Sequence, residues 1–245
     1  MDIWLRNLRF ASRRLMQNPG FAATLLVILG LGVGANTAIF SIVDALLFSP
    51  ALPYQNPDRA VRIYITEPKS DRTEWLCHPE YSELKVQADL FSQTAAASDM
   101  DVWSLQKENG TFTVLGEIWS PSLFSMVEVP PFMGWTLQPG DDAAGAEPVV
   151  MLSYTAWQTQ HGADPEIVGK SIRLNGFLVT IVGIGPKDFK GTIVAISSDY
   201  WIPWGTARVL NPSNSRLDDR RNREVRAFAE LQPGITQRGL TAATQ

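Results

Sequence analysis

An uncharged run near the N-terminus constrains the fold of this chain more than any other feature. No Asp, Glu, Lys or Arg occurs at residues 15–43, which are 29 positions dominated by Leu, Val, Ile, Phe, Ala and Gly. A helix rises about 1.5 Å per residue and the hydrocarbon core of a bilayer is about 30 Å thick, so about 20 apolar residues suffice to cross it. The sequence therefore predicts a single transmembrane helix over residues 21–48.

The charges on either side of this run predict its orientation. Because Lys and Arg are retained on the cytoplasmic side of a membrane, the basic start of the chain is expected to stay inside. Residues 1–20 then form a cytoplasmic lead-in, with the pattern of an amphipathic helix along the inner membrane surface over residues 3–16. Everything after residue 48 is expected outside. The four orienting side chains are Arg6, Arg9, Arg13 and Arg14.

Small residues within the apolar run have three interpretations. Gly30, Gly34 and Ala38 recur every four positions, which would let another membrane helix approach one face, and this is the interpretation that we favour. Residues 30–35 also fit the loose dinucleotide-binding pattern GxGxxA, but a proline-rich segment follows where that fold needs further strands and helices. A signal peptide cleaved near Ala51 is the third interpretation, although the apolar run is longer than in typical signal peptides.

The rest of the chain, residues 49–245, has the pattern of an α+β domain. Two pairs of strand-like segments each flank an Asn-Gly dipeptide, which suits the positive backbone angles of a tight hairpin turn. Helical and alternating patterns predict one helix and two further strands. The hairpins pair residues 100–106 with 111–119 around Asn109-Gly110, and residues 171–174 with 177–184 around Asn175-Gly176; the helix spans residues 79–90 and the other strands span residues 60–65 and 225–231.

The sequence lacks the usual patterns of a catalytic or metal site. GxSxG, GxxxxGK and HExxH are all missing, and neither His78 nor His161 has Cys or His at ligand spacing. Cys77 and His78 are adjacent, and neighbours on a strand point to opposite faces. The formal net charge of -4 argues against a nucleic-acid partner. We therefore predict that the chain is not an enzyme and binds no cofactor, metal or nucleic acid.

Two further groups of residues have an ordinary structural interpretation. The acidic pair Asp141-Asp142 lies among Gly and Ala and is interpreted as part of a turn. Trp201 and Trp204 belong to a set of eight tryptophans, and we expect them to pack in the core. The alternative is that they present an aromatic surface to a partner or to lipid.

The residues resemble those of a known family, the MacB-like or FtsX-like permeases of ABC transporters, in particular the bacterial orphan permeases with no ATPase domain on the same chain. The most specific match is residues 31–41 (LGVGANTAIFS), which resemble the first membrane helix of that family. The resemblance extends over the lead-in and over the domain that follows. Its other segments are residues 5–11, 18–21, 43–45, 52–54, 57–59, 148–154 with Trp157, 164–165, 168–170, 174–176, 182–184 and 189–191.

The resemblance implies an inner-membrane permease subunit that couples ATP hydrolysis by a separate ABC ATPase to movement of a periplasmic core domain. Its expected partners are the lipid bilayer, that ATPase, and other permease membrane helices or a second permease copy. The family continues to three more membrane helices, so we expect residues 49–245 to be a core domain that is incomplete at its C-terminus. The alternative is a secreted or membrane-anchored extracytoplasmic binding domain with no transport role.

Overall fold

The computed structural model describes residues 17–47, 52–66, 73–86, 89–143, 145–193, 196–211 and 217–235. The chain divides into two units, Met1–Pro50 and Ala51–Gln245, and each is described by itself. The predicted lead-in helix over residues 3–16 lies outside the described residues.

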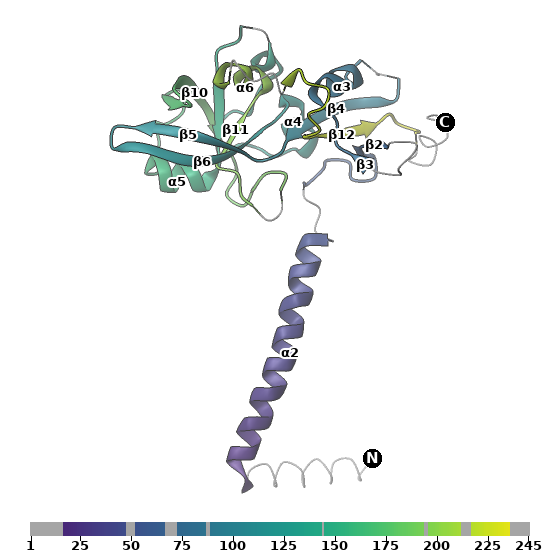
Figure 1. Ribbon diagram of the computed structural model, residues 1–245, viewed down its shortest axis with the longest axis vertical. Coiled ribbons are helices and arrows are strands. Elements are labelled where there is room, and N and C mark those ends of the chain that lie inside the picture. The colour runs from purple at the N-terminus through teal and green to yellow at the C-terminus, as the bar shows by residue number, and fades with distance from the viewer. Residues whose placement is uncertain are drawn as a thin grey trace. The chain divides into compact units, whose positions relative to one another are not determined.

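The first unit contains one long apolar helix, α2 (Pro19–Leu47), of 29 residues (Figure 1). Pro19 suits the first helical position, because its fixed backbone angle fits a helix and its missing N–H would be unpaired there anyway. The segment Pro19–Ser41 is long and apolar enough to cross a membrane. Thr24 and Thr37 donate their hydroxyls to the carbonyls four residues earlier, at 2.9 and 2.8 Å. The helix thus pairs these hydroxyls internally, as an apolar surrounding demands.

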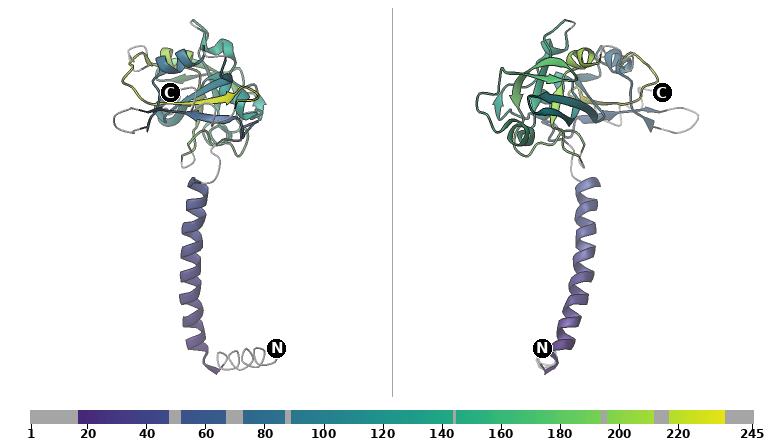
Figure 2. Two further views of the ribbon diagram at one scale, coloured as in Figure 1. Left: turned by 90° about the vertical axis from the view of Figure 1, so that its right-hand side faces the viewer. Right: turned by 60° about the vertical axis from the view of Figure 1, so that its left-hand side comes forward.

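The second unit is built around a seven-stranded sheet in the order β7-β10-β8-β11-β6-β5-β9, in which β9 also pairs with β10 (Figures 1 and 2). Six of these strands therefore pair in a closed ring, which leaves β7 attached to β10. Closure removes unpaired edges of the kind that invite association with other chains. The strands are β5 (Asp101–Lys107), β6 (Gly110–Ile118), β7 (Met133–Gly134), β8 (Val149–Leu152), β9 (Ser171–Leu174), β10 (Phe177–Ile184) and β11 (Tyr200–Ile202).

A smaller antiparallel sheet joins segments from both ends of the second unit. Its order is β1-β12-β4, so the late strand β12 lies between two early ones. A two-stranded sheet, β2-β3, completes the strands of the described chain. These strands are β1 (Ala60–Ile63), β2 (Ile65–Thr66), β3 (Thr73–Glu74), β4 (Phe91–Ser98) and β12 (Val225–Leu231).

Short helices cover the strands of the second unit, and α5 and α6 lie on opposite sides of them in Figures 1 and 2. Local capping explains the bounds of α5: the Ser153 hydroxyl accepts a hydrogen bond from the Ala156 N–H, and Gly162 ends the helix with a φ of 63°. The helices are α3 (His78–Leu84), α4 (Pro121–Val127), η1 (Pro139–Asp142), α5 (Tyr154–His161) and α6 (Trp204–Leu210).

One predicted hairpin is confirmed and the other is displaced by one residue. Leu174 pairs with Phe177, and the turn residues Asn175 and Gly176 have φ values of 48° and 88°, as predicted. In the other hairpin Lys107 pairs with Gly110, so the turn residues are Glu108 and Asn109 rather than Asn109 and Gly110. The core side chains set this register, because Trp103 and the Val114 opposite it are both buried, as is Leu105.

Three other local predictions are corrected or confirmed. The helix predicted over residues 79–90 begins at His78 and ends at Leu84, because the chain must turn to enter β4. Cys77 is consequently the residue that caps a helix rather than part of a strand. The strand predicted over residues 60–65 is interrupted at Tyr64, whereas β12 has the predicted bounds.

The two tryptophans around α6 pack in the core, as expected. Trp201 is 0% exposed and Trp204 is 4% exposed. Trp201 lies in one aromatic group with Trp119, Phe124 and Phe189, whose ring centroids are 5.8, 6.2 and 5.4 Å from its own. These residues therefore present no aromatic surface to a partner or to lipid.

Candidate functional site

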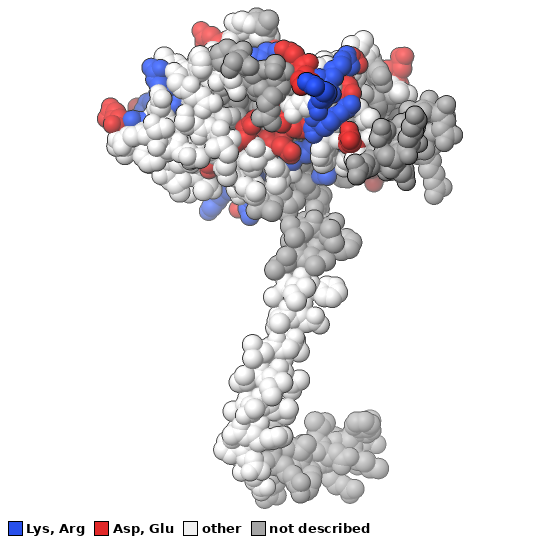
Figure 3. Space-filling model, viewed as in Figure 1, with Lys and Arg blue, Asp and Glu red and all other residues white. Residues whose placement is uncertain are grey.

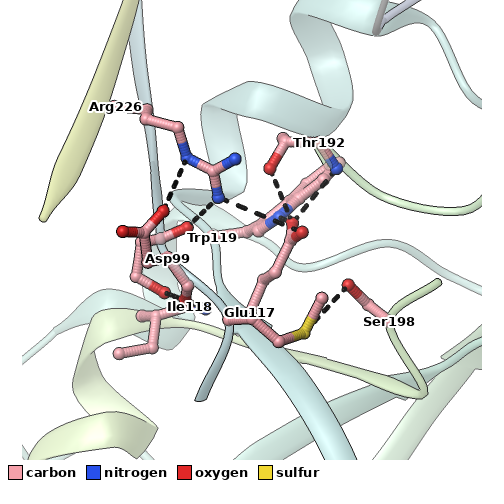
Figure 4. Close-up of polar contacts among 9 residues, drawn as sticks. Asp99, Glu117, Ile118, Trp119, Thr192, Ser198 and Arg226 are labelled. Atoms are coloured by element: carbon pink, nitrogen blue, oxygen red, sulfur yellow. Dashed lines mark hydrogen bonds and ion pairs between the residues drawn. The ribbon is translucent and has the colours of Figure 1, made fainter. Parts of the chain in front are cut away.

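Two side chains of opposite charge are buried where the small sheet meets the large one (Figure 4). Glu117, near the end of β6, is 0% exposed, and Arg226, on β12, is 8% exposed. Removing a charge from water costs several kcal/mol unless the group is paired and hydrogen-bonded. A buried pair that joins two sheets is therefore the strongest candidate for a functional site in the second unit.

The Glu117 carboxylate is held mainly through one of its oxygens. Oε2 accepts hydrogen bonds from the indole N–H of Trp119, from the backbone N–H of Thr192 at 3.2 Å and from the Thr192 hydroxyl at 2.9 Å. Oε1 has no hydrogen-bond partner among the described residues and lies 4.0 Å from Nη2 of Arg226. The carboxylate is thus oriented by the loop after β10 and is neutralised only loosely by the arginine.

Gly191 allows that loop to reach the carboxylate. Its φ of +103° strains any L side chain, and an added Cβ would lie 2.8 Å from Oγ of Ser198 and 3.2 Å from Oε1 of Glu117. Only glycine therefore fits at this position without displacement of its neighbours.

The Arg226 guanidinium connects the two sheets. Its Nη2 donates to the Ser98 carbonyl, and its Nε lies 3.8 Å from Oδ1 of Asp99. Burial lowers the pKa of Arg226, and the charges of Glu117 and Asp99 act in the opposite direction. A guanidinium stays protonated at neutral pH. Arg226 thus acts as a fixed positive charge between β4 and β6.

Uncharged hydrogen bonds strengthen the same junction. The Ile118 N–H donates to the Ser98 hydroxyl at 2.9 Å. The Ser120 hydroxyl accepts from the Ala96 N–H at 2.8 Å, and the Ser120 N–H donates to the Ala96 carbonyl at 2.8 Å. These contacts join the end of β6 to β4. We use the name polar junction for the buried pair and the side chains around it, which are Ser98, Asp99, Glu117, Trp119, Thr192 and Arg226.

The residues that the sequence singled out on the membrane helix have no described packing partner. An added Cβ at Gly30 or Gly34 would have nothing within 4 Å, and Ala38 is exposed. Helix packing at these positions therefore stays a prediction. In Figure 3 the part of this helix that is not grey carries no charge, whereas charges gather on the second unit. Arg6, Arg9, Arg13 and Arg14 lie outside the described residues.

The two histidines do not meet each other or a metal-binding cluster. The His78 ring centroid lies 4.7 Å from that of Trp204 with the ring planes tilted by 47°, and Nε2 of His161 lies 2.8 Å from the Tyr200 hydroxyl. Burial lowers the pKa of each histidine to about 4. Within the described ranges, no group of three or more His, Cys, Asp or Glu side chains could hold a metal ion.

Sequence reasoning missed the polar junction entirely. Glu117 and Arg226 each occur in an apolar strand, and that is the only local signal that either side chain is buried. Their partnership depends on strand pairing between distant segments, which a linear pattern does not encode.

Comparisons with known proteins agree with this architecture. The family model of the MacB-like periplasmic core domain matches residues 22–244. A search of curated proteins gave no significant match. Among solved structures, the periplasmic region of MacB from Actinobacillus actinomycetemcomitans aligns with a TM-score of 0.58 and 14% identity, covering 82% of this chain and 85% of that one.

Two further solved structures share the fold. A domain of a proposed permease protein from Porphyromonas gingivalis aligns with a TM-score of 0.53 and 18% identity, covering 78% of this chain and 82% of that one. The extracellular domain of the noncanonic ABC-type transporter YknZ from Gram-positive bacteria aligns with a TM-score of 0.51 and 12% identity. The alignment covers 71% of this chain and 84% of that one.

The family match and the apolar helix together suggest a membrane-anchored protein. The matched family is a component of transporter permeases rather than a class of enzymes. The resemblance found in the sequence is therefore confirmed at the level of the family and the fold. The chain belongs to the MacB-like periplasmic core domain family of ABC-type transporter permeases.

Proposed function

We propose that the chain is a membrane permease component whose extracytoplasmic domain is moved by a separate ABC ATPase. The observation that carries this proposal is one continuous family match, residues 22–244, which includes both the apolar helix and the domain. The sequence contains no GxxxxGK phosphate loop, which agrees with ATP hydrolysis by a separate subunit. Residues 1–20 are proposed to be cytoplasmic, residues 21–48 to span the inner membrane, and residues 49–245 to form the periplasmic domain.

The proposed mechanism is mechanical transmission. At about 1.5 Å per residue, the 29 residues of α2 exceed a hydrocarbon core about 30 Å thick. The helix is therefore long enough to carry a displacement across the membrane and beyond it. Within the domain, the polar junction joins the two sheets, which supports movement of the domain as one body rather than as two.

Copurification tests the coupling to an ATPase. The tagged full chain is purified from its own membranes in a mild detergent and assayed for vanadate-sensitive ATP hydrolysis. We expect hydrolysis to accompany the chain above the level of untagged membranes. If the intact, folded chain is purified without any vanadate-sensitive ATP hydrolysis, the proposed coupling to an ATPase is contradicted. A mature N-terminus near Ala51 would instead favour an exported binding domain.

Orientation is tested with single-cysteine variants. The sole native cysteine, Cys77, is 0% exposed, so added cysteines report with little background. Lys187→Cys, in the domain, is expected to react with a membrane-impermeant maleimide in spheroplasts, and Gln17→Cys only after lysis, because the arginines before the helix stay in the cytoplasm. The reverse labelling pattern would refute the proposed topology.

Helix packing is tested with two matched substitutions on α2. Gly34→Leu is expected to weaken association of the helix with other membrane helices, because a large side chain prevents close approach. Gly32→Leu makes the same chemical change about 200° away around the helix, and it too has free space within 4 Å. Energy transfer between labelled copies and coexpressed permease helices measures association. Equal effects of both substitutions would show that the Gly30, Gly34 and Ala38 face is not special.

A further inference from the structure

A small pocket lined by residues of β4, α4 and η1 and by Lys85, just after α3, lies in the second unit. Its volume is about 240 Å³. Neither charged member of the buried pair, Glu117 or Arg226, lines it. The lining residues are Lys85, Thr94, Ser120, Pro121, Ser122, Pro139 and Asp142.

The pocket carries one positive and one negative charge that do not pair with each other. No ion pair within 4.0 Å joins Lys85 to Asp142, both of which belong to the described chain. The Lys85 ammonium lies 4.8 Å from the centroid of the Tyr81 ring. Burial raises the pKa of Asp142, and the Lys85 charge opposes that rise. The two charges therefore influence each other across the pocket, although no direct contact neutralises them.

Hydroxyl groups surround the same pocket. The Ser120 and Ser122 hydroxyl oxygens are 3.0 Å apart, and Ser122 donates to the Thr94 carbonyl at 2.7 Å. These bonds fix both serine side chains in place.

The Tyr81 hydroxyl is one of several buried polar groups that have no hydrogen-bond partner among the described residues. Tyr81 is 0% exposed, and its hydroxyl makes no hydrogen bond of good geometry to a described residue. Burial raises its pKa to about 12, the nearby Ser120 and Ser122 hydroxyls lower it, and the Asp142 charge raises it. Ser120, Ser122 and Asp142 line the pocket, whereas Tyr81 itself does not. An unpaired buried hydroxyl is costly.

We propose that this pocket binds a small zwitterion of the free α-amino acid class, with its ammonium at Asp142 and its carboxylate at Lys85. Two separated, unpaired charges complement a molecule that carries both signs, and charge-assisted hydrogen bonds are the strongest available contacts. A simple anion would face Asp142 and a simple cation would face Lys85, so each is disfavoured. Sites for drug-sized ligands measure about 300–1,000 Å³, so this volume suits a smaller molecule.

The inference goes beyond the proposed transport role and does not depend on an ATPase. Titration calorimetry on the purified full chain compares glycine and L-serine with acetate and methylammonium, which carry one charge each. We expect saturable binding of the amino acids and much weaker binding of both single-charge probes. Lys85→Met and Asp142→Asn should each weaken glycine binding about tenfold or more, because each removes one charge-assisted bond. The exposed neighbours Lys187 and Asp188 supply matched controls, Lys187→Met and Asp188→Asn, which should leave binding unchanged.

Three outcomes would overturn the proposal. They are no binding of either amino acid, acetate binding as tight as that of glycine, and methylammonium binding as tight as that of glycine. Circular dichroism checks that Asp142→Asn folds, since Asp142 also accepts a hydrogen bond from the Gly205 N–H at 3.4 Å. If that variant unfolds, Lys85→Met decides.

Discussion

Replacing Arg226 by Met is expected to lower the free energy of unfolding of the second unit by about 3–5 kcal/mol. The substitution keeps a long side chain but removes the only described cation within 4.0 Å of the Glu117 carboxylate. Because Glu117 is 0% exposed, water cannot replace the lost charge. Denaturant unfolding of the full chain in detergent, followed by tryptophan fluorescence, measures the change.

A double variant separates the effect of charge from that of packing. Adding Glu117→Gln to Arg226→Met removes the uncompensated charge and is expected to restore most of the lost stability. If the double variant is as unstable as Arg226→Met, then packing rather than charge explains the loss. Arg221→Met serves as a surface control. Arg221 pairs with Asp219 at 3.2 Å with 91% of its side chain exposed, so its removal should change stability little.

Gly116→Ala is expected to destabilise the second unit by about 1–3 kcal/mol, through overpacking inside the strand ring. An added Cβ would lie 2.0 Å from Cζ3 and 2.5 Å from Cη2 of Trp103. Trp103 is 6% exposed and sits on the neighbouring strand β5, so its ring cannot swing into solvent. The thermal unfolding midpoint measures the effect.

A smaller ring should relieve this clash. The atoms that an alanine at position 116 would meet belong to the six-membered ring of the Trp103 indole, so Trp103→Phe is expected to accommodate it. The cost of Gly116→Ala should therefore be smaller in the Trp103→Phe background than in the native chain. Gly140→Ala is the control, because a Cβ there has nothing within 4 Å. Equal costs in both backgrounds would rule out the clash as the cause.

Local signals predicted the parts of the fold that depend on local chemistry. The apolar run gave the long helix, the Asn175-Gly176 turn gave one hairpin, and the tryptophans around α6 were correctly assigned to the core. The first hairpin shows where such signals fail, because the packing of Trp103 and Leu105 outweighs the turn preference of Asn109-Gly110 and moves the turn by one residue. Propensity is a weak guide wherever core packing sets the register.

The candidate sites were beyond sequence reasoning for a different reason. Glu117 and Arg226 belong to strands of two different sheets, and no periodicity in either strand indicates the other. The sequence predicted Asp142 in a turn, and the structure places it at the end of the short helix η1. The fold alone brings Asp142 and Lys85 to the same pocket. Family resemblance identified the architecture, but it named none of these side chains.

The central position of β12 in the small sheet also affects how the domain folds during its synthesis. β1 pairs with β12, for example Ala60 with Glu230, so this sheet cannot close until nearly all of the second unit has been synthesised. At about 5–20 residues per second, the early strand waits on the order of ten seconds for its partner. During that interval β1 and β4 lack the strand that separates them, and a chaperone that covers them would find its binding site there.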